Sequence, residues 1–226
     1  MSSPRARILA RLGQVALEPD WLAPEIPIPR FDWGPQRRLE RFQEQLDAVR
    51  GEMHRVGDNW ASRALGLLRE RGASRLLFGP DAELAAGLEA AWREAGGESS
   101  GLRLIPYGEP VERLRDTLFD AVDAGITGCR GAIAETGTVV LWPDVREPRL
   151  LSLVPPVHLV LLEAGSIRST FAELLDEQGW SQGMPSNALL ITGPSKSADI
   201  EQTLAYGVHG PKELIVLIRG DGEGSG

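Results

Sequence analysis

The chain of 226 residues has one cysteine, Cys129, and three histidines, His54, His158 and His209. One cysteine excludes a disulfide within the chain and any iron–sulfur cluster ligated by this chain alone, because such clusters take several thiolates. The histidines lie far apart and form no HExxH or other metal-binding pattern. We therefore expect no metal or redox cofactor on this chain, and the single thiol fits a reducing compartment.

Long apolar runs and an excess of basic charge are also missing. No apolar stretch approaches the ~20 residues that cross a bilayer, and the start of the chain lacks the apolar core of a secretory signal. Acidic residues outnumber basic ones by 32 to 24, without a basic stripe that would favour nucleic acid. Walker A and GxGxxG motifs are absent from the sequence as well. These absences predict a cytoplasmic protein with neither a membrane span nor a nucleic-acid partner.

Short apolar runs alternate with helical patterns along most of the chain. Runs of this kind, without polar alternation, are typical of parallel strands covered on both faces. The pattern predicts a three-layer α/β/α sandwich with a mostly parallel sheet. The strands are expected at 75–78, 102–105, 158–162, 188–192 and 214–218, and the helices between them at 81–94, 110–123 and 166–178, the last capped by Ser166.

The N-terminal part is predicted to be an arm that packs on this domain. Residues 1–14 have the pattern of a short amphipathic helix, and 18–35 carry five prolines and three aromatic residues in an extended segment. The aromatic residues indicate either a strap across the same domain or docking on a sister subunit, as in a homodimer. A helical pattern over 36–71 is interrupted by two glycines. We expect an arm at 1–60, one α/β domain at 61–220 and a disordered tail at 221–226.

A hairpin interrupts the alternation and supplies the first candidate site. Strands are predicted at 126–134 and 138–142, joined by the turn Glu135-Thr136-Gly137. A carboxylate at a glycine-flanked turn suits a base, a nucleophile or an acceptor for a substrate hydroxyl. The alternative is a turn that is stabilised by its own threonines, Thr136 and Thr138.

The segment 192–201 supplies the second candidate site. It follows an apolar run, and Ser195 or Ser197 is placed to cap a short helix that begins near Ala198. A helix N-terminus beyond the carboxyl end of a strand suits a carboxylate or phosphate. The alternative is a simple capped turn, with acidic residues interacting with the helix dipole. The candidate ligand-binding residues of the two sites are Thr136, Gly137 and Thr138 at the hairpin, and Gly193, Pro194, Ser195, Lys196, Ser197 and Glu201 in this segment.

Two further residues, Asp199 and His209, complete the candidate catalytic set with Glu135. His209 lies in the turn before the last strand, where it could be the titrating partner of Glu135 or Asp199. A turn histidine bonded to backbone is the equal alternative for His209. Cys129 lies in a glycine-rich strand, where a buried and inert thiol is the favoured interpretation.

Three ordered blocks carry a family resemblance: GITGCRGAIAETGTVVLW, RLLSLVPPVHLVLL and TGPSKSADIEQTLAYGVHGPKELIVLI. Together, over 123–218, they closely resemble the lactate-utilisation protein C family, the LUD domain (LutC/YkgG-like). The resemblance implies a fold similar to the sugar-phosphate isomerase and CoA-transferase superfamily. It also implies a role in oxidising L-lactate to pyruvate beside two partners, an iron–sulfur subunit with its own LUD domain and a cysteine-rich subunit. Lys196 and Ser197 stand where the family pattern has Arg and Thr, which keeps a cation and a hydroxyl.

Three functions are consistent with these features. The first is a non-redox subunit of an L-lactate oxidation complex that binds a small anionic or nucleotide-like ligand, with the iron–sulfur clusters on its partners. The second is a stand-alone enzyme of the CoA-transferase or cyclo-ligase kind, with Glu135 as nucleophile or base. The third is a regulatory module that senses a small anion.

Overall fold

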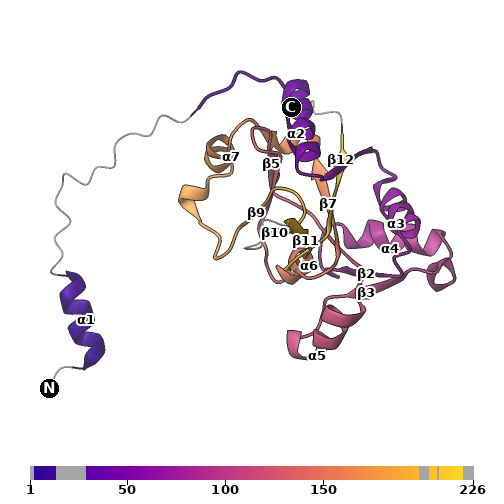
Figure 1. Ribbon diagram of the computed structural model, residues 1–226, viewed down its shortest axis with the longest axis horizontal. Coiled ribbons are helices and arrows are strands. Elements are labelled where there is room, and N and C mark those ends of the chain that lie inside the picture. The colour runs from indigo at the N-terminus through magenta and orange to yellow at the C-terminus, as the bar shows by residue number, and fades with distance from the viewer. Residues whose placement is uncertain (1–2, 14–28, 199–203, 208, 221–226) are drawn as a thin grey trace.

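The computed structural model describes residues 3–13, 29–198, 204–207 and 209–220 (Figure 1). It shows the expected three-layer α/β/α architecture, built on a six-stranded sheet in the order β1-β12-β7-β4-β2-β3. Every neighbouring pair in this sheet is parallel. Its strands are β1 (Glu52–Val56), β2 (Arg75–Phe78), β3 (Arg103–Pro106), β4 (Ala124–Thr127), β7 (Val157–Glu163) and β12 (Glu213–Arg219).

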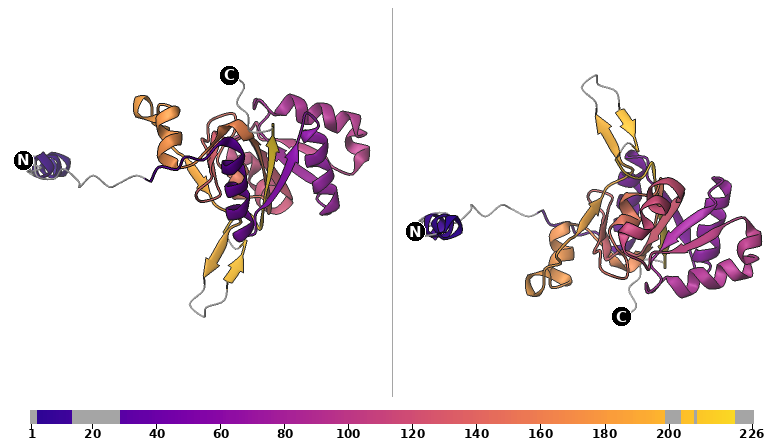
Figure 2. Two further views of the ribbon diagram at one scale, coloured as in Figure 1. Left: turned by 90° about the horizontal axis from the view of Figure 1, so that it is seen from above. Right: turned by 90° about the horizontal axis from the view of Figure 1, so that it is seen from below.

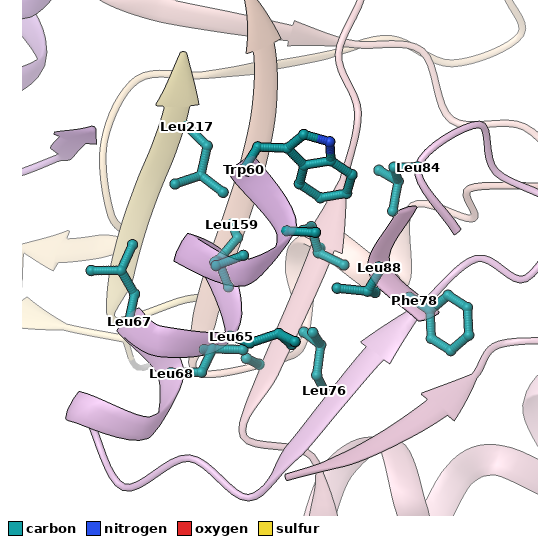
Figure 3. Packing of buried hydrophobic residues seen from close by; sticks show 14 of the residues in the cluster. Trp60, Leu65, Leu67, Leu68, Leu76, Phe78, Leu84, Leu88, Leu159 and Leu217 are labelled. Carbon is teal, nitrogen blue, oxygen red and sulfur yellow. The ribbon is translucent and has the colours of Figure 1, made fainter. Parts of the chain in front are cut away.

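One face of the main sheet is covered by two helices, α3 (Trp60–Glu70) and α4 (Ala85–Glu94). Figure 3 shows Leu65 and Leu68 of α3 packed over the strands, with Leu88 of α4 beside them. These leucines are fully buried. Burying such side chains contributes about 1.5–3 kcal/mol each, so this layer holds the helices firmly on the sheet.

A more varied layer covers the opposite face. It contains α2 (Pro35–Ala48), α5 (Val111–Asp116), which runs into a π-helical turn, η3 (Thr117–Ala121), and the short α6 (Leu150–Leu153). A second sheet also lies here, in the order β8-β5-β6-β9. Its strands are β5 (Gly131–Ile133), β6 (Thr138–Leu141), β8 (Ile167–Arg168) and β9 (Leu189–Ile191).

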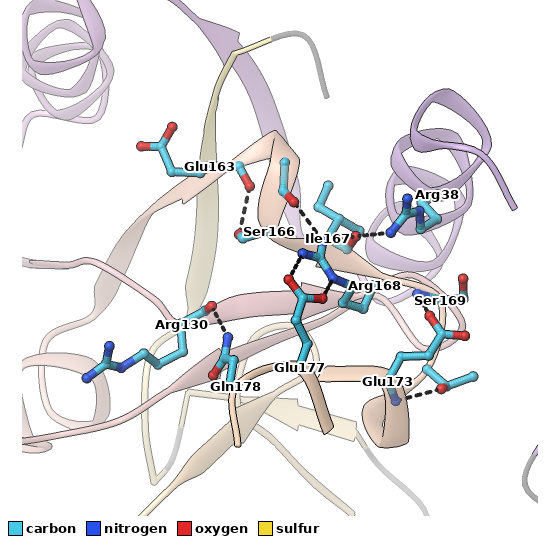
Figure 4. Close-up of polar contacts among 12 residues, drawn as sticks. Arg38, Arg130, Glu163, Ser166, Ile167, Arg168, Ser169, Glu173, Glu177 and Gln178 are labelled. Atoms are coloured by element: carbon cyan, nitrogen blue, oxygen red, sulfur yellow. Dashed lines mark hydrogen bonds and ion pairs between the residues drawn. The ribbon is translucent and has the colours of Figure 1, made fainter. Parts of the chain in front are cut away.

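The second sheet packs against helices on both of its faces. Phe42 of α2 is fully buried against the side that faces the main sheet. On the other side lie α7 (Phe171–Glu177) and Trp180, which begins the short turn η5 (Trp180–Gln182). Arg168 forms a two-pronged ion pair with Glu177 of α7 (Figure 4). These contacts fix the position of the β5–β6 hairpin.

The predicted elements agree with the structure in most of the chain. The hairpin at Glu135-Thr136-Gly137 forms, between β5 and β6. The expected single strand over 126–134 is divided between the two sheets, as β4 and β5. The strand predicted at 188–192 is β9, which pairs antiparallel with β6 in the second sheet and not with the main sheet. Two short turns that the sequence did not predict are η2 (Gly97–Ser100) and η4 (Ala164–Ser166).

The predicted cap of α7 is wrong. Ser166 belongs to η4, where its hydroxyl donates to the carbonyl of Glu163 at 2.7 Å. The actual N-cap is Thr170, whose Oγ1 accepts the N–H of Glu173 at 3.2 Å. The helix starts later because residues 167–168 are held as strand β8 against β5.

The N-terminal segment follows the prediction only in part. Helix α1 (Pro4–Gly13) is present, and its Ile8 and Leu9 are exposed. Most of the proline-rich arm lies outside the described residues, as does the tail 221–226. Phe31 stacks on Trp33 at a ring-centroid distance of 4.1 Å, and Trp33 packs on the domain's own core, which favours a strap for this end of the arm. Strand β1 belongs to the main sheet, and the division at residue 60 stays a prediction.

The predicted helix beginning near Ala198 is wrong. Residues Lys196–Ala198 form β10, which pairs antiparallel with β11 (Leu204–Tyr206) in a two-stranded ribbon. The N–H of Ser195 donates to the carbonyl of Pro211 at 2.8 Å, and its own carbonyl accepts from Gly207. These two bonds join residue 195 to residues 207 and 211, which follow β11 in the chain. The backbone directly after residue 195 is therefore extended and not helical. Figure 2 shows the ribbon standing away from the body of the molecule.

Candidate functional site

A pocket of about 360 Å³ opens at the carboxyl edge of the main sheet. The chain runs outward from β2 to β3, returns past β2 to β4, and then continues to β7 and β12. The direction therefore reverses between β2 and β4, and ligands of open α/β sheets bind at such a reversal, beyond the carboxyl ends of the strands. The wall contains residues 82–84 and 87 after β2, and residues 127–130 at the end of β4. Fold topology and cavity therefore place a candidate ligand site here, the carboxyl-edge pocket.

The loop after β6 closes the pocket from the side of the second sheet. Its backbone passes directly over the end of β2, because a Cβ at Gly79 would lie 2.0 Å from the carbonyl oxygen of Arg146. Two further contacts shape the loop. Glu147 Oε1 accepts the N–H of Gly128 at 2.9 Å, and Asp144 accepts the N–H groups of Arg146 and Glu147. The loop thus holds residues 144–149 against the ends of β2 and β4.

Four arginines and four acidic residues line the carboxyl-edge pocket: Arg130, Arg146, Arg149 and Arg219, with Glu83, Asp144, Glu147 and Glu163. Arg219 donates to Glu163 at 2.7 Å, which joins the ends of β12 and β7. Arg146 pairs with Asp144 at 3.1 Å. Among the described residues, neither Arg130 nor Arg149 has a carboxylate partner. Arg130 lies over the Trp142 ring, with its guanidinium carbon 4.8 Å from the ring centroid.

Burial raises the pKa of two groups in the wall. Burial raises the pKa of the Glu147 carboxyl, in spite of its bond from the N–H of Gly128. Burial also raises the pKa of the Cys129 thiol to about 12, and its Sγ donates to the carbonyl of Leu161 at 3.4 Å. A thiol with this pKa is protonated at neutral pH, so Cys129 is no thiolate nucleophile there.

Asp144 behaves differently from Glu147. Desolvation opposes its ionisation, but the backbone N–H groups of Glu147 and Arg146 and the Arg146 guanidinium lower its pKa overall. Asp144 therefore stays charged and acts as a fixed anchor for the loop. Its charge is already matched by Arg146.

Thr127 in the lining of the carboxyl-edge pocket forms a buried pair with His158. Thr127, the last residue of β4, lines the pocket and is 4% exposed. Its Oγ1 lies 2.9 Å from Nε2 of His158, which is completely buried on β7. Burial lowers the pKa of His158 to about 3, so the ring is neutral at physiological pH.

The residues predicted from the sequence lie elsewhere. Thr136, Thr138 and Thr192 form a chain of hydroxyl groups, with Oγ1–Oγ1 distances of 2.7 and 2.6 Å. The structure therefore joins the hairpin turn and the start of the 192–201 segment. Gly137 packs on α2 and Gly193 on its C-cap residue, because a Cβ would lie 2.7 Å from Gln45 and from Val49, respectively.

The remaining predicted residues are not brought together with Glu135. Glu135 is half-buried at the turn, and no hydrogen bond or ion pair of its side chain occurs with the rest of the described chain. His209 is exposed, and its neighbour Gly210 packs against Ser195. Asp199 and Glu201 lie outside the described residues, as does the side chain of Ser197. Lys196 is exposed on β10, and Pro194 is buried.

The 192–201 segment also begins at the opposite end of the sheet from the prediction. Ser195 bonds to Pro211, and Lys212 donates to the carbonyl of Pro156, directly before β7. These contacts lie at the amino ends of β7 and β12, not at their carboxyl ends. The predicted position was wrong because β9 was taken as a parallel strand of the main sheet. Whether the segment binds a ligand stays a prediction.

Sequence reasoning missed the residues of the carboxyl-edge pocket. They come from segments that are far apart in the chain, and only tertiary packing brings them together. One signal was present in the sequence, the glycine-rich run Thr127–Gly131. It was placed inside the strand predicted at 126–134, so the end of β4 at Thr127 was not recognised.

The fold and the carboxyl-edge pocket define a three-layer α/β protein with its cavity at a topological switch point. The sequence pattern of the LUD domain matches residues 39–218, and the chain belongs to the LUD domain family. An uncharacterized protein of Neisseria meningitidis serogroup B is 35% identical over 226 residues, which cover 95% of this chain and 93% of that protein.

Other relatives carry a functional name. Lactate utilization protein C of Bacillus subtilis is 38% identical over 106 residues, so the match spans under half of either protein, 45% of this chain and 44% of that one. Lactate utilization protein C 1 of Bacillus mycoides is 28% identical and covers 80% of this chain and 78% of that protein. A crystal structure of a DUF162 family protein from Deinococcus radiodurans shares the fold, with a TM-score of 0.55 and 22% identity, covering 83% of this chain and 99% of that chain.

No three His, Cys, Asp or Glu side chains among the described residues form a group suited to holding a metal ion. None of the helices described there combines the length and apolar character that crossing a bilayer requires.

Proposed function

We propose that this chain serves in lactate utilisation as a cytoplasmic, non-redox subunit that binds a small anionic ligand in the carboxyl-edge pocket. The observation that carries the proposal is the pair Arg130 and Arg149, which line this pocket without a carboxylate partner among the described residues. Guanidinium groups bind carboxylate and phosphate oxygens through paired N–H donors. The names of the relatives supply the lactate context.

The charges in the wall are compatible with an anion. Two of the four acidic residues are neutralised by Arg219 and Arg146. Burial raises the pKa of a third carboxyl, that of Glu147. L-Lactate, pyruvate and a nucleotide-like phosphate all present the oxygens that the arginines recognise.

The redox centres belong to other proteins in this proposal. The chain has one cysteine, and its thiol is protonated at neutral pH, which suits neither cluster ligation nor thiol redox chemistry. An iron–sulfur subunit with its own LUD domain and a cysteine-rich subunit would transfer the electrons.

A thermal-shift panel tests ligand binding. L-Lactate, pyruvate, phosphate and a nucleotide are added to the purified protein, and a ligand at 100 times its dissociation constant adds about 2.7 kcal/mol of stability. We expect at least one of them to raise the melting temperature, and Arg149→Ala to abolish the rise. Arg149 is exposed, so this variant is expected to fold.

Arg55→Ala is the matched control, because Arg55 is an exposed arginine on β1 that does not line the pocket. It is expected to keep the full ligand-induced shift. No shift with any of the four compounds would contradict ligand binding. Normal growth on L-lactate after deletion of the gene would contradict the role in lactate utilisation.

A further inference from the structure

The polarity of the buried hydrogen bond between His158 and Thr127 can be assigned from the surroundings of the ring. Nε2 of His158 lies 2.9 Å from Thr127 Oγ1. Nδ1 is fully buried, and no hydrogen-bond partner for it exists within the described part of the chain. A neutral imidazole carries one proton, on one of these two nitrogens.

The two tautomers of His158 differ in free energy. A proton on Nδ1 would bury an N–H donor without an acceptor, and Thr127 would have to donate to Nε2. A proton on Nε2 leaves only an unused lone pair on Nδ1, while the N–H bond goes to Thr127. An unpaired buried donor is rarer in proteins than an under-used acceptor. The Nε2–H tautomer is therefore the one that this environment favours.

This tautomer determines what Thr127 presents to the carboxyl-edge pocket. The Thr127 oxygen accepts from His158, so the Thr127 O–H group is free to donate to a different acceptor. No other hydrogen bond of the Thr127 hydroxyl is found among the described residues, and the side chain lines the pocket. The neighbouring hydroxyl of Ser152 offers no such donor, because it already donates to the carbonyl of Arg149 at 3.0 Å.

We infer that His158 is a positioning residue that turns the Thr127 hydroxyl into a hydrogen-bond donor for an acceptor oxygen of the anionic ligand, a carboxylate or phosphoryl oxygen. The inference rests on the proposed ligand site and deepens it. Arg149 and Arg130 supply charge, and Thr127 supplies a directed neutral donor. Together they select a ligand with an oxygen acceptor over one that offers only donors.

The tautomer can be measured without any ligand. Long-range ¹H–¹⁵N correlation spectra of the protein labelled at histidine nitrogen distinguish protonated from unprotonated ring nitrogens. The chain has three histidines, and the His158 signals are those lost in His158→Gln. We expect the proton on Nε2, with both nitrogen shifts unchanged between pH 7.5 and pH 5. A proton on Nδ1 would overturn the inference and leave the proposed function standing.

Calorimetric titration with L-lactate, pyruvate and inorganic phosphate tests the donor role. Thr127→Val removes the hydroxyl and keeps the shape, and we expect it to weaken binding of the tightest probe by about ten-fold or more. Thr127→Ser keeps the hydroxyl and should stay within about three-fold of the wild type. His158→Gln retains an N–H donor toward Thr127 and is expected to rescue most of the affinity that His158→Leu loses.

The outcomes separate the two proposals. Equal affinity of Thr127→Val and wild type would overturn the donor role while ligand binding persists. Failure of all three probes to bind the wild-type protein would contradict the proposed function and, with it, the role of Thr127 toward a ligand. Should Thr127→Val fail to fold, Thr127→Ala serves as the second variant and the same comparison with Thr127→Ser applies.

Discussion

Gly125→Ala is expected to destabilise the protein by about 3 kcal/mol, the upper end of the usual cost of overpacking a core. A Cβ on Gly125 of β4 would lie 2.2 Å from the backbone carbonyl oxygen of Leu151 and 3.0 Å from Cγ of Pro155. The closest atom belongs to the backbone of α6, which cannot rotate away as a side chain can. The alanine must push α6 off the sheet or distort β4, and α6 carries Ser152 in the pocket wall.

Gly66→Ala is the matched control. Gly66 lies inside α3, and a Cβ there meets no atom within 4 Å. Alanine in a helix interior is favoured over glycine by up to about 1 kcal/mol, so this variant should equal or exceed the wild type in stability. Thermal unfolding checks both, with Gly125→Ala expected to melt about 6–12 °C lower. Equal melting temperatures of the two variants would show that the Leu151 carbonyl of α6 does not approach Gly125 of β4 so closely.

Acid is expected to destabilise the protein through His158. The folded state holds the pKa of this ring at about 3, below its ordinary value of 6.5, because burial disfavours the charged form. The unfolded chain therefore binds a proton below about pH 6.5 that the folded protein does not take up until about pH 3. The contribution of the neutral His158 ring to the free energy of unfolding is fully present above pH 6.5. It is lost as the pH falls toward 3.

Between pH 7 and pH 4 this single group accounts for a loss of about 3 kcal/mol. Other groups titrate in the same range, so the measurement is a comparison. Urea unfolding of wild type and His158→Gln at both pH values should show that the wild type loses about 3 kcal/mol more than the variant. Parallel losses in the two proteins would mean that His158 is accessible to protons in the folded state.

The sequence predicted the fold well because its signals are local. Runs such as 214–218 are apolar without alternation, which parallel strands buried on both faces require. Strand β1 was missed because its sequence, Glu52–Val56, is mostly polar. This strand lies at the edge of the sheet, where burial is only partial and apolar residues are not needed.

The candidate sites were harder to predict for a different reason. Whether 196–198 continues as a helix or a strand depends on the bonds of Ser195 to Pro211 and Gly207, which no local pattern encodes. The same holds for Arg149 and Thr127, which are 22 residues apart and meet at one pocket. His158 belongs to no metal-binding pattern in the sequence, and only its distance to Thr127 connects it with a cavity.

Calorimetric titration of three proteins with the probe that gives the largest thermal shift tests the central claim, that the anion binds at the carboxyl edge of the sheet. The three are the wild type, Arg149→Ala and Lys196→Ala. Arg149 lines the carboxyl-edge pocket, whereas Lys196 is exposed on the ribbon. We expect Arg149→Ala to weaken binding about ten-fold or more and Lys196→Ala to leave it unchanged. Loss of binding in Lys196→Ala, with full affinity in Arg149→Ala, would contradict the account and place the anion at the 192–201 segment.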